Sequence, residues 1–142
     1  MATVPFPPLI GDHHLDPVAN ECLLWHGTKP DVAPLIVHGG FDERVCALSG
    51  LFGAGVYFAM NSSKSDQYCT PDPAGVYTIF VSRVVLGKPE RTATGRSNER
   101  RASPGFDSVI GQTGPVKYRE FIVYDRNQTY PEYRLSYKRM SR

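Results

Sequence analysis

The feature that most constrains this chain is its density of helix-breaking residues. Its 142 residues include 12 prolines and 13 glycines, spread along most of the length. Such residues interrupt regular structure, so the sequence predicts many turns, much loop, and short strands rather than long helices. The length suits one domain, which can bury a core without disulfide bonds.

The clearest element is a strand over residues 75–87, a segment rich in β-branched and aromatic side chains. Shorter apolar runs predict strands at 21–27, 56–58, 118–124 and 132–137. Residues 88–116 are expected to form a long loop. The predicted organisation is an irregular N-terminal arm over 1–20, followed by one domain of the α+β class over 21–142.

Two short helices are expected. The first runs from Asp31, as its cap, to His38, with Pro34 in the first turn and Gly39 and Gly40 ending it. The second covers residues 63–68 after Ser62 as its cap.

The charge balance gives little support for a nucleic-acid partner. The formal net charge is +2 and the isoelectric point about 8.5, which is too mild to indicate such binding by itself. The arginines of the predicted loop, at 91, 96, 100 and 101, could touch phosphates. Because Glu90 and Glu99 lie between them, a solvated surface is the favoured interpretation.

Cys22, Cys46 and Cys69 are widely spaced and odd in number, which fits free thiols better than disulfides or a zinc site. We therefore expect no metal. The N-terminus lacks a basic segment followed by an apolar run, and no stretch approaches the roughly 20 apolar residues that cross a bilayer. These features predict an intracellular protein, cytoplasmic or nuclear, without a membrane partner.

Three segments carry side chains suited to chemistry: Leu24–Thr28, Phe52–Ala59 and Tyr118–Asp125. Each has an ordinary structural explanation when taken alone. His26 could be a core histidine, Tyr57 a packing residue, and Glu120 a solvated charge at a strand end.

Taken together and in order, the three segments resemble the catalytic domain of the poly(ADP-ribose) polymerase family, with tankyrases as the most similar branch. His26 matches the histidine of the family's histidine-glycine motif, Tyr57 the tyrosine of its Gly-x-Tyr-Phe-Ala strand, and Glu120 the glutamate that opens its last-but-one strand. Further likeness lies in residues 40–44, 61–65, 104–109 and 130–133.

The resemblance implies an ADP-ribosyltransferase fold with two packed, mainly antiparallel sheets, short flanking helices and an NAD+ cleft. It implies a glycosyltransferase (pentosyltransferase) activity that releases nicotinamide from NAD+ and transfers ADP-ribose, as one unit or a polymer, to a protein acceptor or to the enzyme itself. NAD+ would be a substrate, and a nucleic acid is the disfavoured partner.

The resemblance also implies roles within the site. His26 and Thr28 would serve the adenosine ribose, while Gly27 and Ser65 would bind the nicotinamide carboxamide. Tyr57 and Tyr68 would sandwich the nicotinamide ring, a geometry that suits a flat cationic ring. The residues of the implied catalytic triad are His26, Tyr57 and Glu120, and those lining the pocket wall are Ala59 and Lys64.

Two other interpretations of the sequence remain open. A module that binds NAD+ or ADP-ribose without turnover would keep the pocket but would not need Glu120, and a basic nucleic-acid reader would show strongly salt-dependent binding. The sequence lacks the glycine patterns of Rossmann and P-loop proteins. For Asp107, Asp125 and Glu132, solvated or capping roles are expected.

Overall fold

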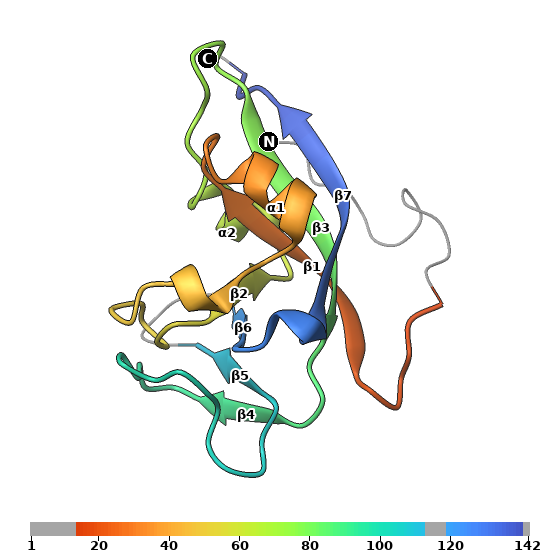
Figure 1. The fold of residues 1–142 in the computed structure, drawn as a ribbon, viewed down its shortest axis with the longest axis vertical. Coiled ribbons are helices and arrows are strands. Elements are labelled where there is room, and N and C mark those ends of the chain that lie inside the picture. The colour runs from red at the N-terminus through yellow and green to blue at the C-terminus, as the bar shows by residue number, and fades with distance from the viewer. Residues whose placement is uncertain (1–13, 113–118, 141–142) are drawn as a thin grey trace.

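The computed structural model describes residues 14–112 and 119–140 (Figure 1). Seven strands and two short helices form the regular structure of this part of the chain. The strands are β1 Glu21–Thr28, β2 Val56–Ala59, β3 Tyr77–Val85, β4 Pro89–Thr92, β5 Ser108–Gly111, β6 Glu120–Val123 and β7 Thr129–Tyr137. The helices are α1 Ala33–Gly39 and α2 Ser62–Asp66, with single 3-10 turns at Glu43–Val45 and Arg126–Gln128.

The strands form one hydrogen-bonded sheet in the order β4-β5-β6-β2-β1-β3-β7. All pairs are antiparallel except β4 with β5. The α+β class is confirmed, whereas the expected division into two packed sheets is not. The sheet is nevertheless weakly joined at its middle, because β1 and β2 share a single register pair, Trp25 with Ala59.

Side chains alternate between the two faces of the sheet, and each face buries its own core. On one face, which we call the α1 face, Leu24, Phe58 and Phe121 pack with Ile36 of α1. On the other, the α2 face, one cluster contains Phe52 and Ile122 and another contains Trp25 and Ile79. In Figure 1 α1 lies in front of β1 and α2 behind it.

The two predicted helices exist with different caps. Helix α1 begins at Ala33 with Pro34 in its first turn, but Val32 is the N-cap and no side chain caps it, so the predicted capping role of Asp31 is wrong. Its end is as expected: Gly40 takes a positive φ of 76° and donates its N–H to the carbonyl of Ile36.

Helix α2 is shorter than predicted. It ends at Asp66, and Asn61, not Ser62, is its N-cap. Tyr68 therefore lies beyond the helix, in a turn closed by its N–H to the carbonyl of Ser65. The direction of the Tyr68 side chain is therefore set by this turn and not by the helix.

The prediction of an unbroken loop over 88–116 is wrong for its described part. Residues 89–92 and 108–111 form β4 and β5, which pair in parallel at one edge of the sheet. The segment between them is held by Glu90, which receives hydrogen bonds from Arg96 and from the backbone N–H of Ser103. These contacts hold the pKa of Glu90 at about 2, mainly through the Arg96 hydrogen bond.

The other predicted strands are confirmed within two or three residues. Of the segment 118–124, residues 120–123 form β6 and Tyr118 lies outside the described residues. Strand β7 starts at Thr129 and includes Pro131. Because β7 is an edge strand, a residue without an N–H is tolerated there, and the register shifts beside it at Val81/Ser82.

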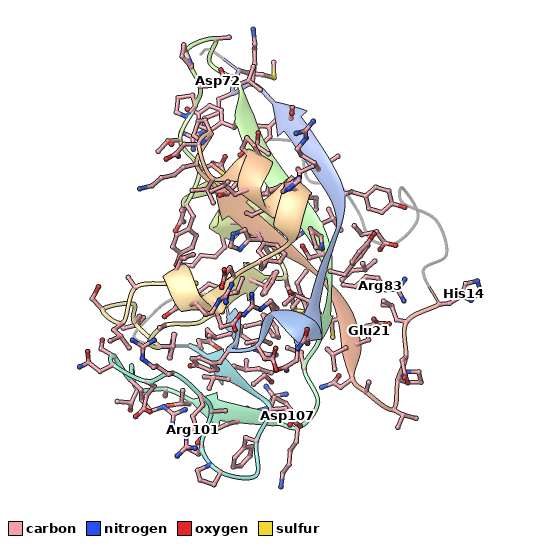
Figure 2. The ribbon with its side chains drawn as sticks, viewed as in Figure 1. His14, Glu21, Asp72, Arg83, Arg101 and Asp107 are labelled. Atoms are coloured by element: carbon pink, nitrogen blue, oxygen red, sulfur yellow. The ribbon has the colours of Figure 1, made fainter. Side chains whose placement is uncertain are left out.

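The predicted arm of residues 1–20 is described only from His14, since residues 1–13 lie outside the described part. Asp16 organises a turn there by accepting from the N–H groups of Val18 and Ala19. Arg83 of β3 reaches Glu21 of β1 with an N–O distance of 2.9 Å, and His14 lies beside this pair in Figure 2. The turn therefore continues directly into the sheet. In the part of the chain that the structure describes, no helix is long and apolar enough to cross a membrane.

Candidate functional site

Glu120 is a buried carboxylate at the start of β6, with 7% of its surface exposed. It pairs with Ala59 of β2 and Gly111 of β5, and alternation places its side chain on the α2 face together with Ile122. One carboxylate oxygen accepts a hydrogen bond from the hydroxyl of Tyr68. No ion pair to Glu120 is formed by the described residues, and the side chain that donates a hydrogen bond to it there is the neutral hydroxyl of Tyr68. Burying a carboxylate without a cation is costly, and such groups are commonly functional.

His26 lies on the opposite, α1 face, where β1 and β2 separate. Its ring packs edge-on to Phe41, with centroids 4.8 Å apart, and against Phe58 at 5.5 Å. Its Nδ1 lies 2.7 Å from the carbonyl oxygen of Tyr57. Burial lowers the pKa of His26 to about 4, so the ring is neutral at pH 7.

The hydrogen bond from His26 fixes its tautomer. A carbonyl oxygen can only accept, so Nδ1 carries the proton and Nε2 is left as an acceptor. The side chain thereby bridges β1 and β2 just beyond their single register pair, where backbone pairing has stopped. It also presents a hydrogen-bond acceptor at the junction of the sheet.

Gly27 brings β1 against the end of α2. A Cβ atom at this position would clash with the carbonyl oxygen of Ser65 and would lie 2.8 Å from the sulfur of Cys69. Only glycine allows this approach. Ser65 is 2% exposed, and the thiol of Cys69 donates to the carbonyls of Ser65 and Thr78. The predicted pair Gly27 and Ser65 is therefore brought together.

Tyr57 and Tyr68 approach the site from different elements. The hydroxyl of Tyr57 donates to the carbonyl of Gly53 at 2.9 Å and accepts from the N–H of Phe52 at 2.7 Å, so the ring is anchored to the loop before β2. Tyr68 is 47% exposed. Its pKa is raised, first by desolvation and then by the neighbouring Glu120 carboxylate. The hydroxyl of Tyr68 therefore stays protonated and able to donate.

The remaining predicted residues surround this group. Ala59 is buried opposite Glu120, and the ammonium of Lys64 lies 5.9 Å from the centre of the Tyr68 ring. Thr28 is buried on the α1 face with His26. Two of the nine predicted binding and catalytic residues, His26 and Thr28, thus lie on the α1 face. The other seven lie in α2, in the turn after it or on the α2 face of the sheet: Gly27, Tyr57, Ala59, Lys64, Ser65, Tyr68 and Glu120.

Sequence reasoning missed the residues that hold α2 in place. Asp66, the last residue of α2, accepts hydrogen bonds from the hydroxyl of Tyr137 and, at 2.9 Å, from Arg139. The Arg139 guanidinium also lies 4.2 Å from the centre of the Tyr77 ring, which stacks on Tyr137 at 5.5 Å. We call this group of four residues the α2 clamp. No spacing in the sequence connects Asp66 to residues more than 70 positions away.

Of the carboxylates set aside from the sequence, two have clear structural roles. Asp125 caps a 3-10 turn by accepting from the N–H of Asn127. Asp107 accepts from the N–H of Lys88. Within residues 14–112 and 119–140, no three His, Cys, Asp or Glu side chains are grouped as metal ligands would be.

Comparison with known proteins shows the family of this chain. A family model described as the poly(ADP-ribose) polymerase catalytic domain matches residues 12–139. The chain is 30% identical over 128 residues to mouse (Mus musculus) protein mono-ADP-ribosyltransferase PARP12, covering 87% of this chain and 18% of that protein. It is 36% identical over 104 residues to human (Homo sapiens) protein mono-ADP-ribosyltransferase PARP3, covering 69% and 19%.

A tankyrase is also among the similar proteins. The poly [ADP-ribose] polymerase tankyrase of Caenorhabditis elegans is 34% identical over 91 residues, which cover 62% of this chain and 4% of that protein. The matched region therefore spans less than a fifth of each of these three relatives. The match to the family model extends over nearly the whole chain and includes all the predicted site residues. This chain belongs to the poly(ADP-ribose) polymerase catalytic domain family.

Proposed function

We propose that this chain is an NAD+-dependent protein ADP-ribosyltransferase domain, a glycosyltransferase that releases nicotinamide. The observation that carries the proposal is Glu120, a buried carboxylate whose described partner is the Tyr68 hydroxyl rather than a cation. Membership of the family supports the same reaction, since the relatives include proteins named as mono-ADP-ribosyltransferases and a poly(ADP-ribose) polymerase.

The nicotinamide end of NAD+ would lie on the α2 face. The backbone of Gly27 would supply a donor and an acceptor for the carboxamide, and Ser65, whose backbone carbonyl lies against Gly27, would add its hydroxyl as a further hydrogen-bonding group. Tyr57 and Tyr68 would bracket the ring. The cationic ring of NAD+ favours the π faces of these tyrosines over bulk water.

The adenosine end would reach His26 and Thr28. In the neutral tautomer described above, Nε2 of His26 accepts a hydrogen bond, and a ribose hydroxyl is a suitable donor. These two residues project from the α1 face, whereas Gly27 faces α2. NAD+ would therefore span the junction between β1 and β2, where one register pair joins the two halves of the sheet.

Glu120 would act on the ribose next to the nicotinamide. Nicotinamide leaves NAD+ as a neutral molecule, so no general acid is needed, and positive charge develops on the ribose as the bond breaks. A fixed carboxylate stabilises that charge and accepts a hydrogen bond from the ribose 2′-hydroxyl. Binding would require the Tyr68 hydroxyl, which now donates to Glu120, to share this carboxylate with the ribose.

The second product, the ADP-ribosylated acceptor, would form by attack of the acceptor on the ribose. An acceptor nucleophile forms the new bond to the anomeric carbon and loses its proton, while the electron pair of the broken bond leaves with nicotinamide. Glu120 would orient the acceptor. We propose a protein acceptor, including the chain itself, and the transfer of one or of several ADP-ribose units.

Incubation with NAD+ labelled in the adenylate moiety tests the proposed function. We expect label to become covalently attached to protein and free nicotinamide to appear in the same reaction. Binding of NAD+ without label transfer or nicotinamide release, measured with acceptor proteins present, would instead favour a binding module. Transfer that is abolished by excess nicotinamide would connect the activity to the Gly27 and Ser65 pocket.

A further inference from the structure

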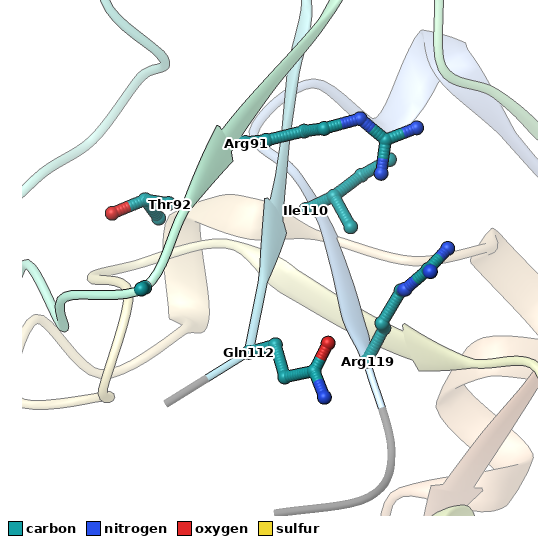
Figure 3. A pocket seen from close by; sticks show the side chains of 6 residues that line it. Arg91, Thr92, Ile110, Gln112 and Arg119 are labelled. Atoms are coloured by element: carbon teal, nitrogen blue, oxygen red, sulfur yellow. The ribbon is translucent and has the colours of Figure 1, made fainter. Parts of the chain in front are cut away.

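A second site lies away from the proposed NAD+ site, at the β4 end of the sheet. An open pocket of about 330 Å³ is lined by Arg91, Thr92, Ala93, Ile110, Gln112 and Arg119. None of these residues belongs to the proposed NAD+ site. Figure 3 shows the Arg91 and Arg119 side chains extending to the same side, with Ile110 between them.

The two arginines are free of acidic partners within the described chain. Ion pairs occupy the guanidinium groups of Arg44, Arg83, Arg96, Arg126 and Arg139. The side chains of Arg91 and Arg119 form no such pair with the described residues, and both are exposed. Glu90, the acidic residue next to Arg91, is already paired with Arg96. The pocket therefore holds two uncompensated positive charges.

Strand alternation separates this pocket from Glu120. Arg91 pairs in register with Ile110, and Ile110 belongs to the core on the α1 face. Arg119 is adjacent to Glu120 in sequence, so its side chain projects to the face opposite Glu120. Arg119 of the pocket directly precedes Glu120, the first residue of β6, but the pocket and the carboxylate open on different sides of the sheet. A ligand in the pocket would not occupy the nicotinamide subsite.

The chemistry of the lining selects an anion with more than one charge. Each guanidinium presents a planar set of N–H donors that matches phosphate oxygens, and two of them can bind two adjacent phosphates. The Thr92 hydroxyl donates to the carbonyl of Thr94, so the two guanidinium groups are the donors on which binding depends. The pocket volume of about 330 Å³ is several times the roughly 30 Å³ that one water molecule occupies in the liquid.

We propose that this pocket binds a diphosphate group, with Arg91 and Arg119 as its two ligands. The diphosphate could be free or carried by a nucleotide, and the two sources share the same recognition. Nucleotides would gain additional contact with the apolar side chains of Ile110 and Ala93. Diphosphate binding at this pocket does not require transfer of ADP-ribose, because it depends only on the charge and the geometry of the pocket.

Isothermal titration of the whole chain with inorganic pyrophosphate tests this site. Arg91→Gln and Arg119→Gln should each weaken binding by about tenfold or more, since each removes a charge-assisted pair of hydrogen bonds. Arg101→Gln is the matched control. It removes the same charge from an exposed arginine that does not line the pocket (Figure 2), and it should change the dissociation constant less than about twofold. The melting temperature of each variant confirms that it is folded.

Three further titrations identify the source and the place of binding. Orthophosphate should bind more weakly than pyrophosphate, and adenosine, which has no phosphate, should not bind here. ADP binding more tightly than pyrophosphate, with affinity that falls in Arg91→Gln, would assign a nucleotide ligand to this pocket, and equal affinity a free diphosphate. Pyrophosphate affinity should be unchanged by a saturating benzamide, whether or not the chain transfers ADP-ribose.

Several results would overturn the proposal. Equal weakening by Arg101→Gln would show diffuse attraction rather than a site, and full affinity in Arg91→Gln and Arg119→Gln would place the anion elsewhere. Displacement of pyrophosphate by benzamide would assign it to the nicotinamide subsite. Absence of pyrophosphate binding at millimolar concentration to the folded wild-type chain would also exclude the site.

Discussion

At the scale of single residues, His26 combines a structural and a proposed catalytic role. Its Nδ1–H donates to the carbonyl of Tyr57, and its ring is packed between Phe41 and Phe58. Because burial lowers its pKa to about 4, the folded chain takes up a proton at His26 less readily than the unfolded chain does. The unfolded value is near 6.5.

This difference predicts a pH-dependent contribution to stability. The contribution is complete above about pH 6.5 and is lost as the pH falls toward 4, because only the unfolded state binds the proton in that window. Between pH 7 and pH 5 the free energy of unfolding should fall by roughly 1–2 kcal/mol through His26. Urea denaturation of the wild type at both pH values measures this loss.

His26→Asn provides the comparison, since asparagine keeps a nitrogen donor near the position of Nδ1 but does not titrate. The variant should show a smaller loss of stability between pH 7 and pH 5 than the wild type does. Carboxylates such as Glu21 and Glu90, whose pKa values are lowered by arginines, contribute equally to both proteins. Identical losses in the two proteins would contradict a neutral His26 in the folded state.

Much of the site at this scale could be predicted from the sequence. Alternation along β1 separates His26 and Thr28 from Gly27, and the motifs around Tyr57 and Glu120 marked both residues. The Tyr68–Glu120 hydrogen bond could not be foreseen. It depends on the early end of α2 and the turn that follows, and neither propensity nor capping rules located that end correctly.

At the scale of elements, α2 is short yet carries or precedes several proposed nicotinamide contacts. Five residues form less than two turns, which are not stable in isolation. The α2 clamp provides the missing support by tying Asp66 to the end of β7 and to Arg139. We therefore expect the position of Ser65 and Tyr68 to depend on Tyr137.

Tyr137→Phe should weaken the binding of a nicotinamide analogue. It removes a hydrogen bond to a carboxylate, an interaction of about 1.5–3 kcal/mol, and part of that loss should appear as a several-fold higher dissociation constant. Fluorescence or calorimetric titration with a benzamide measures it. The turnover of bound NAD+ should change less than the affinity, because Glu120 is untouched.

Tyr130→Phe is the matched control. Tyr130 lies on the same strand and is 62% exposed, so loss of its hydroxyl should leave affinity unchanged. If Tyr137→Phe and Tyr130→Phe bind the benzamide equally well, the α2 clamp does not position the site.

The elements that sequence reasoning missed are the ones with the weakest local signal. Strand β4 reads Pro-Glu-Arg-Thr, with no apolar alternation, and it exists because β5 pairs beside it. The α2 clamp is equally invisible, since its partners are distant in the chain. By contrast, the β-branched run of β3 and the glycines at the end of α1, Gly39 and Gly40, act locally. These local signals were sufficient to predict the strand and the end of the helix.

At the scale of the whole molecule, the proposed NAD+ site lies where the sheet is most weakly joined. The β1–β2 junction has one register pair, whereas β1 and β3 share eight. A ligand that contacts β1, β2 and α2 together would connect the two halves. Binding at this junction should therefore stabilise the fold as a unit.

A benzamide should raise the melting temperature for this reason. At 100 times its dissociation constant, a ligand that binds only the folded state adds about 2.7 kcal/mol to the free energy of unfolding. Differential scanning fluorimetry with increasing benzamide measures the shift. Benzoate, which lacks the amide donor, is the control compound, and equal shifts with both would contradict recognition by Gly27 and Ser65.

The central claim, that Glu120 stabilises charge developing on the ribose, concerns rate rather than binding. Glu120→Gln keeps the size of the side chain and its ability to accept a hydrogen bond, but it removes the negative charge. Loss of one preorganised contact of this kind costs about 2.7–4 kcal/mol, or roughly 100- to 1,000-fold in rate. Glu99→Gln, at an exposed position, is the control, and its activation free energy should stay within about 0.5 kcal/mol of the wild-type value.

The most direct test measures turnover of labelled NAD+ and its dissociation constant on the same preparation of each protein. Glu120→Gln should transfer ADP-ribose at least about 100-fold more slowly than the wild type while binding NAD+ nearly as tightly. Transfer by Glu120→Gln at the wild-type rate would remove Glu120 from the mechanism.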